Sequence, residues 1–196
     1  MLIVRKLTYY VASTVDGFIA TDDGSVDFFP VGGDHGPAIN AQYPETLPTK
    51  VREAIGLQDR NRYFDTVVMG RKTHEFGVRT GTSSPYAHLR QFVVSRTMPE
   101  SPDPAVELIS ADPVQKVRAL KREQGLGIWL CGGGQLAQAL IPEIDQIFLK
   151  LHPIVLGRGR PLFGAGPRLP EPARFRVITS TVFEDGVAVV KYSRIR

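Results

Sequence analysis

The sequence predicts an α/β fold built on a mixed sheet, with parallel strands at its centre and an antiparallel carboxyl end. Through the middle of the chain, short apolar runs typical of buried strands alternate with helical patterns. Such alternation is typical of a parallel sheet packed against helices. Near the carboxyl terminus, two strand-like stretches flank an Asp-Gly pair, which indicates a hairpin turn. Because a length of 196 residues fits one domain better than two, we expect a single domain over residues 1–196.

The first predicted strand covers residues 7–13 (LTYYVAS), which are rich in β-forming side chains. It ends in the polar turn Thr14-Val15-Asp16-Gly17. Residues 22–48 are rich in Asp, Gly and Pro and have little apolar periodicity, so we expect the longest irregular stretch there. This loop faces a ligand in one interpretation and is a tolerated surface insertion in another.

The middle of the chain supplies the alternating elements. Thr49 is expected to cap a short helix over residues 50–57. A second helix is predicted from Asp112 and Pro113 to about Gln124, because a capping aspartate followed by proline favours a helix start. Three short apolar runs are predicted as buried strands: residues 66–69, 92–94 and 128–131.

The last third of the chain changes from alternation to consecutive strands. A short helix over residues 135–140 is followed by strand-like residues 146–156 and 175–195. The second of these is broken by Glu184-Asp185-Gly186, so it is predicted to fold back as an antiparallel hairpin.

Composition is that of an ordinary globular protein, with 42% hydrophobic and 22% charged residues. The net charge of +4 comes from scattered basic residues, which favours a solvated surface over a nucleic-acid interface. The single cysteine, Cys131, excludes an internal disulfide and a thiolate metal cluster, and the four histidines are dispersed, so we expect no metal site. Neither a signal peptide nor a membrane span is evident, and a cytoplasmic location is expected.

Three predicted strands run directly into segments rich in hydrogen-bond donors. In open parallel sheets, ligands bind outside the carboxyl ends of the strands. The three donor-rich segments therefore predict one polyanion site at one edge of the sheet. They are Gly70-Arg71-Lys72-Thr73, Ser95-Arg96-Thr97, and Gly132-Gly133-Gly134 after Cys131.

The triple glycine offers backbone amides that no side chain obstructs, at the start of a helix whose positive end suits a pyrophosphate. Residues 132–137 match G-x-G-x-x-A, but they lie near the last parallel strand and lack the acidic partner of a Rossmann unit. A turn that merely tightens strand–helix packing is the alternative. Arg71, Lys72 and Arg96 would favour an extra phosphate and hence NADP over NAD, although long basic side chains here could simply reach solvent. Thr73 could likewise serve only as a helix-start hydroxyl.

Five segments together resemble the dihydrofolate reductase-like superfamily, most closely the branch of riboflavin-biosynthesis reductases with the RibD C-terminal domain. The resemblance spans nearly the whole chain and rests on the order and spacing of these segments. They are residues 11–20 (VASTVDGFIA), 69–75 (MGRKTHE), 94–97 (VSRT), 132–136 (GGGQL) and 153–163 (PIVLGRGRPLF).

The resemblance implies three layers, with helices on both faces of the sheet, bound NADPH and a homodimer. It places Ala12 and Ile19 beside the nicotinamide. Residues 133–136, including Gln135 and Leu136, would contact the pyrophosphate. The adenosine phosphate would lie against Arg71, Lys72, Ser95 and Arg96. The family chemistry is hydride transfer to a carbon–nitrogen double bond or to an aldehyde-like carbon of a sugar. The Leu-Pro-Trp-like segment of true dihydrofolate reductases is missing, which makes folate an unlikely substrate.

The substrate side is predicted from the loop. Asp27, beside Phe28 and Phe29, is the first candidate proton donor, because aromatic walls raise the pKa of a carboxylate. A loop-capping carboxylate is the alternative. Asp16 is the second candidate; with Gly17 it could hold a mobile loop or simply form a turn. His35 and Arg158 are further substrate candidates, Arg158 for a substrate phosphate, although a surface turn also explains the arginine.

The leading hypothesis is an NADPH-dependent reductase of a small heterocyclic or phosphorylated substrate, such as a 5-amino-6-(5-phosphoribosylamino)uracil-type riboflavin precursor. One alternative is an NADP(H)-binding protein without catalysis, and another is a reductase of pterins. Nucleic-acid binding is a third class, which the absence of a basic stripe disfavours.

Overall fold

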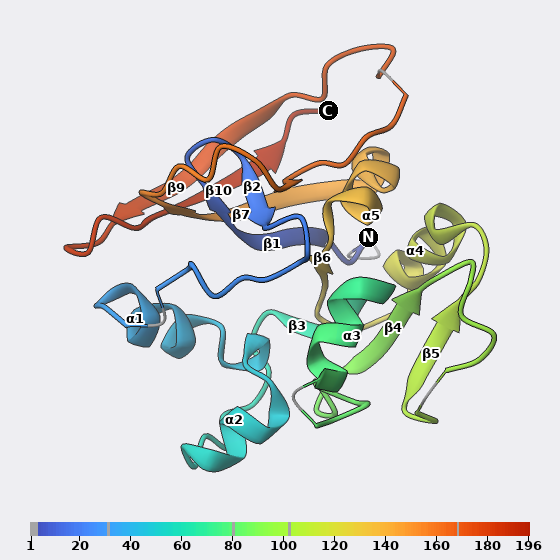
Figure 1. Ribbon diagram of the computed structural model, residues 1–196. Helices are drawn as coiled ribbons and strands as arrows, with labels where there is room; N and C mark the ends of the chain where they lie inside the picture. The colour runs from blue at the N-terminus through green and yellow to red at the C-terminus, as the bar shows by residue number, and fades with distance from the viewer. Residues whose placement is uncertain (1–3, 31, 80, 102, 168) are drawn as a thin grey trace.

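A computed structural model of the chain describes residues 4–30, 32–79, 81–101, 103–167 and 169–196. Its centre is one eight-stranded sheet that twists through the molecule (Figure 1). In spatial order the strands are β5 (Val106–Ile109), β4 (Arg90–Val94), β3 (Phe64–Gly70), β6 (Gly127–Gly132), β1 (Leu7–Thr14), β7 (Ile144–His152), β10 (Ala188–Arg194) and β9 (Phe175–Val182).

The six strands from β5 to β7 are parallel to their neighbours. Strands β10 and β9 are antiparallel and are joined by the predicted turn at Glu184-Asp185-Gly186. The prediction of a mixed, mostly parallel sheet with an antiparallel carboxyl-terminal hairpin is therefore confirmed. The change of direction falls after β7, which runs parallel to β1 and ends at His152 rather than at residue 156.

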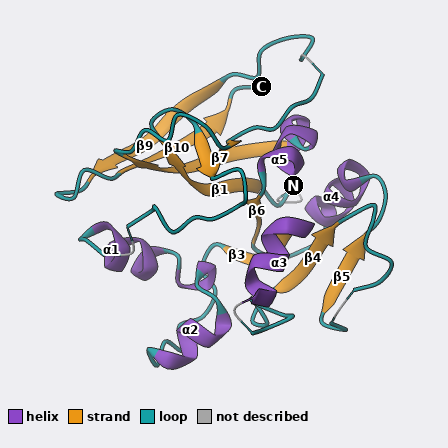
Figure 2. Ribbon diagram, in the orientation of Figure 1, coloured by secondary structure: helices purple, strands orange, loops and turns teal. Residues whose placement is uncertain are grey.

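Helices lie on both faces of the sheet (Figure 2). On one face, α4 (Pro113–Arg122) and α5 (Gly134–Ala139) contribute Val117, Leu120 and Leu136 to a core that includes Tyr9 of β1. On the other face, Ile39 of α1 (His35–Gln42) joins an aromatic core around Tyr10, Tyr43 and Trp129. The remaining helices are α2 (Thr49–Ala54), α3 (Arg71–Arg79) and the 3-10 turns Pro44–Thr46 and Ile141–Glu143. Alternate residues of β1 thus feed two separate cores, as the pleat of a doubly covered strand requires.

A two-stranded ribbon lies outside the main sheet. Strand β2 (Phe18–Ala20) pairs antiparallel with β8 (Arg160–Pro161). The Leu162 amide donates to the Gly17 carbonyl at 2.8 Å, and the Tyr9 hydroxyl donates to the Leu162 carbonyl at 2.8 Å. The loop after β1 is therefore fixed against residues from the far end of the chain.

The expectation of irregular structure throughout residues 22–48 is wrong, because α1 and a 3-10 turn lie inside this stretch. Helix α1 carries Gly36 and Pro37 and has no side-chain cap, so local signals do not indicate it. Tertiary packing stabilises it instead, since Ile39 and the following Tyr43 are buried.

Two further details correct the sequence analysis. Helix α2 begins at Thr49 itself, whose hydroxyl is bonded to Nδ1 of His88 at 2.8 Å rather than capping the helix. Strand β5 was not predicted, because it has only four residues and closely follows a Ser-Pro-Asp-Pro segment. By contrast, Asp112 caps α4 as predicted: its carboxylate accepts from the Gln115 amide at 2.9 Å.

Candidate cofactor and substrate site

The three donor-rich strand ends meet at one edge of the sheet. Gly70 at the end of β3 is paired in register with Val94 of β4, and Met69 is paired with Gly132 of β6. Because these strands are parallel neighbours, the segments that follow them emerge side by side. The structure thus brings together residues that are separated by up to about a third of the chain.

Arg71 connects the first two of these segments. Its Nη1 donates to Oγ1 of Thr97 at 2.9 Å, and its Nε lies 3.3 Å from Oε1 of Glu75 one helical turn later. Lys72 and Arg96 are exposed beside it, and among the described residues neither has an ion-pair partner. Two cations are therefore available at this edge for an anion.

Ser95 has a structural task in addition to its predicted one. Its hydroxyl accepts from the amides of Thr97 at 3.2 Å and Met98 at 3.0 Å, which shapes the turn after β4. This turn presents Arg96 and Thr97 outward, where both are exposed.

The glycine segment is open on one side and tightly packed on the other. A methyl group at Gly132 or Gly133 would meet only Oγ1 of Thr73, at 3.8 and 3.6 Å, and Cδ1 of Ile19, at 4.0 Å from Gly133. A methyl group at Gly134 would overlap the carbonyl oxygen of Pro161. The peptide between Gly132 and Gly133 is cis. The segment therefore presents unobstructed backbone next to Thr73 and Ile19, and this space fits a phosphate group.

The two residues after the glycines take different positions. Gln135 is exposed, whereas Leu136 is buried in the core with α4 and β1. Only the backbone of Leu136 is thus placed to face a cofactor.

Asp16 holds the β1–β2 loop to the segment after β7. Its carboxylate accepts from the Thr14 hydroxyl at 2.6 Å and from the amides of Leu156 at 3.1 Å and Gly157 at 2.7 Å. The hydrogen bond from Thr14, followed by the two amides, lowers the pKa of Asp16 below its usual range. These contacts match the loop-holding alternative, and an ionised carboxylate is a poor proton donor at neutral pH.

Asp27 lies outside the aromatic surroundings predicted for it. The side chain is exposed, and its carboxylate accepts from the Ser25 hydroxyl at 3.0 Å, as in the loop-capping alternative. Phe28 and Phe29 pack on each other with ring centroids 4.3 Å apart, and Phe29 packs on His152 at 4.7 Å. The aromatic pair therefore packs, through Phe29, on a histidine that the sequence analysis did not select.

His35 lies in the same cluster and is buried. Its Nδ1 is bonded to the Asp185 carboxylate in the β9–β10 turn, and its ring meets that of His152 edge-on at 5.4 Å. Burial, followed by the nearby His35 and Lys150, lowers the pKa of His152 to about 4. His152 is consequently neutral near pH 7, and its buried Nδ1 has no hydrogen-bond partner among the described residues.

Arg158 is directed to solvent. It is 86% exposed at the side chain, and its Nε lies 2.6 Å from a carboxylate oxygen of Asp22. The surface-turn alternative describes this position. Its predicted contact with a substrate phosphate would require it to leave Asp22.

Lys150 and Cys131 complete the inner wall of the site. Lys150 on β7 is paired in register with Ala12 of β1, and its Nζ lies 4.9 Å from the ring centroid of Tyr10. Cys131, just before the glycine segment, packs against the same aromatic core as Tyr86, and burial raises the pKa of its thiol to about 12. The thiol is therefore neutral, as expected for a small buried side chain. Sequence reasoning missed Lys150 because one lysine in a strand pattern carries no local signal of function.

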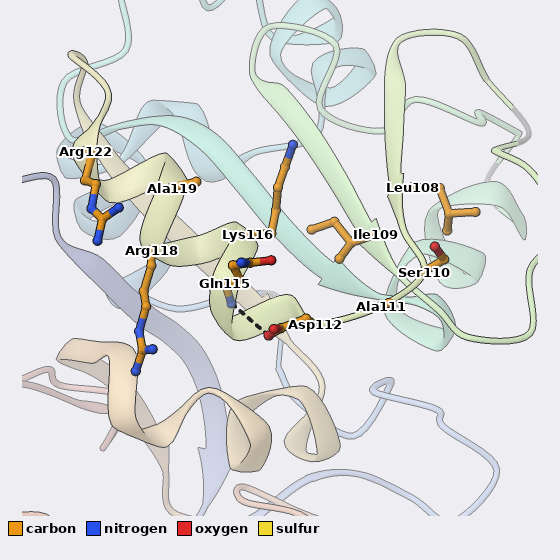
Figure 3. A pocket seen from close by; sticks show the side chains of 10 residues that line it. All are labelled: Leu108, Ile109, Ser110, Ala111, Asp112, Gln115, Lys116, Arg118, Ala119 and Arg122. Atoms are coloured by element: carbon orange, nitrogen blue, oxygen red, sulfur yellow. Dashed lines mark hydrogen bonds between the residues drawn. The ribbon is translucent and has the colours of Figure 1, made fainter.

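A groove between β5 and α4 continues the same edge beyond the end of β4 (Figure 3). The amide of Ser95 donates to the carbonyl of Ile109 at 3.0 Å, which joins the groove to the turn after β4. Lys116 and Arg118 in the groove pair with Glu107 and Glu143, respectively. Its basic groups are thus largely neutralised within the protein.

Two searches over the described part of the chain give negative results. No group of three or more potential ligands among His, Cys, Asp and Glu could hold a metal ion. No described helix has both the length and the apolar character needed to cross a membrane.

The RibD C-terminal domain family matches residues 5–189 of the chain. The uncharacterized protein YwjB of Bacillus subtilis (strain 168) is 30% identical over 164 residues, which cover 81% of this chain and 83% of YwjB. The chain therefore belongs to the RibD C-terminal domain family, a family of NADPH-dependent reductases with the dihydrofolate reductase-like fold.

Solved structures agree with this assignment. A Shewanella sp. PV-4 structure, provisionally described as a riboflavin biosynthesis protein, has 26% identity and a TM-score of 0.70, covering 97% of this chain and 99% of the other. Dihydrofolate reductase from Enterococcus faecalis, complexed with NADP(H) and RAB-propyl, has a TM-score of 0.65 at 16% identity, covering 97% of each chain. The latter similarity is one of fold.

Proposed function

We propose that this protein is an NADPH-dependent reductase that transfers a hydride to a small heterocyclic substrate. The observation that carries the proposal is the convergence of three donor-rich segments at the carboxyl edge of β3, β4 and β6. Family membership supports the same cofactor class. NADPH, when bound, supplies the hydride, and the protein's task is to hold, orient and shield the reactants.

Different residues at this edge would bind different parts of the cofactor. Lys72 and Arg96, with Arg71 held by Thr97, are placed to bind the adenosine phosphate, which NADPH has and NADH lacks. Gly132 and Gly133 leave room beside Thr73 for the pyrophosphate. Ile19 lies beside Gly133, and we assign it to the nicotinamide together with Ala12 of β1.

The substrate half of the site favours a flat, partly polar ring. Phe28 and Phe29 supply aromatic surfaces beside His152 at the end of β7. A pyrimidine of the riboflavin precursor type suits these surfaces, and a pterin is the second candidate. Neither Asp27 nor Asp16 is placed as a buried acid, so their predicted catalytic roles remain to be tested by substitution.

The cofactor assignment is tested by replacing Arg71 and Arg96 with alanine and titrating NADPH and NADH by fluorescence. We expect the Kd for NADPH to rise about tenfold or more in the double variant, because charge-assisted contacts to a phosphate are lost. The Kd for NADH should change by less than about twofold, because NADH has no such phosphate. Arg176→Ala is the matched control, since Arg176 is an exposed arginine on β9 at the opposite edge of the sheet.

An equal rise in the Kd for NADPH and the Kd for NADH in the double variant would contradict the phosphate assignment. NADPH oxidation is then measured with 7,8-dihydrofolate and with 5-amino-6-(5-phosphoribosylamino)uracil. Cofactor binding without oxidation by any pterin or ribosylated pyrimidine would instead support a non-catalytic NADP(H)-binding protein.

A further inference from the structure

Lys150 occupies an unusual position for a lysine. It is half-buried on β7, with its Nζ over the ring of Tyr10 at 4.9 Å. Among the described residues it makes neither an ion pair nor a hydrogen bond, and its ammonium is not one of the fully enclosed polar atoms without a partner. The cation thus keeps access to the surrounding space but has no carboxylate to neutralise it.

Such an arrangement costs stability, because a cation in a protein interior without a counterion loses hydration that nothing replaces. Two buried cations of this protein are paired, whereas half-buried Lys191 on β10, like Lys150, has no ion pair among the described residues. Lys121 contacts Asp145 at 2.6 Å, and Arg5 contacts Asp65. Lys150 and Lys191 thus share the lack of a counterion, and Lys150 differs in being paired in register with Ala12 of β1.

The position of Lys150 relative to the cofactor edge is well defined. The lysine is in register with Ala12, the residue expected beside the nicotinamide. Strand β1 lies between β7 and β6, and β6 ends at Gly132. Lys150 is therefore one strand away from β6, on the strand next to Ala12.

We propose that Lys150 is the substrate-contacting cation of this reductase, which binds the oxygen or nitrogen of the bond being reduced and donates a proton to it. The inference rests on the proposed function and deepens it by assigning the proton donor that Asp27 and Asp16 are poorly placed to be. The substrate class is a heterocycle with a ring carbonyl or a carbon–nitrogen double bond.

The chemistry balances with the groups present. As a hydride from NADPH reaches the carbon of the double bond, the electron pair of that bond moves to its heteroatom. The heteroatom takes a proton from Nζ of Lys150, which becomes a neutral amine and is reprotonated by water. The substrate gains two electrons and two hydrogens, and NADPH is oxidised to NADP⁺.

The groups around Lys150 favour this role. Burial lowers the pKa of Lys150, and the Cys131 sulfur acts weakly in the opposite direction. Tyr10 faces it from β1, and His152, which lies two residues further along β7 and is neutral near pH 7, faces it from the same strand. The Asp185 carboxylate is already bonded to His35. A lysine whose pKa is moved toward neutrality releases its proton more readily than an exposed lysine does.

The test uses lumazine (pteridine-2,4-dione), a fluorescent ring that combines a pterin skeleton with the paired carbonyls of uracil. Lumazine is titrated into the full-length protein saturated with NADP⁺ at pH 7, which gives a binding readout without turnover. We expect Lys150→Met to weaken lumazine binding about 10-fold to 100-fold, because a charged hydrogen bond is lost. Lys150→Arg, which keeps the charge, should stay within about threefold of the wild type. The Kd for NADPH should be unchanged in both.

Lys191→Met is the matched control. Lys191 is also half-buried, lies over the rings of Tyr43 at 4.9 Å and Phe148 at 5.5 Å, and has a pKa lowered by burial. The Lys191→Met variant should bind lumazine as tightly as the wild type does. Thermal unfolding of each variant identifies any loss of lumazine binding that is due to misfolding. If Lys150→Met is misfolded, the test rests on the comparison of Lys150→Arg with the wild type.

The proposal is overturned if Lys150→Met binds lumazine as tightly as the wild type, if Lys191→Met loses as much, or if the wild-type NADP⁺ complex binds no lumazine. In these cases normal NADPH binding would leave the proposed reductase function standing. Failure of the wild type to bind NADPH at all would instead contradict the proposed function itself.

Discussion

At the scale of single residues, His152 couples the candidate site to pH. Its pKa of about 4 lies below the ordinary value of 6.5, so the folded protein favours the neutral ring. As the pH falls from 6.5 toward 4, the unfolded chain takes up a proton at His152 that the folded chain does not. Stability is therefore lost across this window and unaffected by His152 above it.

We expect His152→Phe, which keeps an aromatic ring against Phe29, to remove this loss. The unfolding free energy that is lost between pH 7 and pH 4 should be smaller in the variant by about 2 kcal/mol. Urea denaturation of both proteins at several pH values measures the difference. Parallel curves for the two proteins would show that His152 does not titrate differently on folding.

The residues that could be predicted from sequence are those whose chemistry is local. Gly132, Arg71 and Ser95 each follow an apolar strand directly, so strand order alone brings them together. Lys150 and His152 could not be found this way, because their significance comes from Tyr10, Cys131 and Phe29, which are distant in sequence. Asp27 was misplaced because adjacent phenylalanines in sequence need not pack around it in space.

At the scale of elements, the loop that carries Phe28 and Phe29 is clasped by the β9–β10 turn. The Asp34 carboxylate accepts from the amides of Glu184 at 3.0 Å and Asp185 at 3.2 Å. The bond between His35 and Asp185 lies beside it. The antiparallel hairpin thus helps to hold a loop of the substrate half of the site.

Removing this clasp should loosen the loop without unfolding the sheet. We expect Asp34→Ala to increase hydrogen exchange in residues 22–30 and 183–187 by about fivefold to tenfold, because two inter-element hydrogen bonds are lost. Exchange in β3 and β6 should not change. Asp27→Ala is the control, since the Asp27 carboxylate bonds only within its own loop. Unchanged exchange in the loop of Asp34→Ala would mean that packing alone holds it.

Helices and strands with strong sequence patterns form where they were predicted. The hairpin and α4 carry an Asp-Gly turn and an Asp-Pro start, respectively, and both form as predicted. Helix α1 and strand β5 were not predicted, because tertiary contacts rather than local secondary-structure signals specify them. Ile109 of β5 is buried in the core with Val117, although the strand itself is only four residues long.

At the scale of the whole molecule, β9 leaves one edge of the sheet unprotected. Val177, Ile178 and Val182 are 57%, 49% and 74% exposed, and no described strand pairs with the outer side of β9. An apolar edge with free backbone groups invites a second chain. This surface suits the homodimer that the family resemblance implies.

We expect the protein to be a homodimer in which β9 lies at the interface. Light scattering after size-exclusion chromatography should give twice the 21.6 kDa chain mass for the wild type. Val177→Lys should shift the protein toward the monomer, because a charge replaces an apolar contact. Thr49→Ser, far from β9, should not. A monomeric wild type would exclude the interface, and a dimeric Val177→Lys would move it elsewhere.

The placement of β1 between β6 and β7 has a consequence for biosynthesis. Strand β1 pairs with residues 128–130 on one side and with residues 144–152 on the other. Its two edges therefore stay unpaired while the long stretch of chain that separates β1 from these partners is translated. Contacts of such large sequence separation slow folding and expose strand edges to aggregation. The arrangement that unites the site in the folded protein thus leaves β1 without its partners during much of synthesis, when a chaperone can shield it.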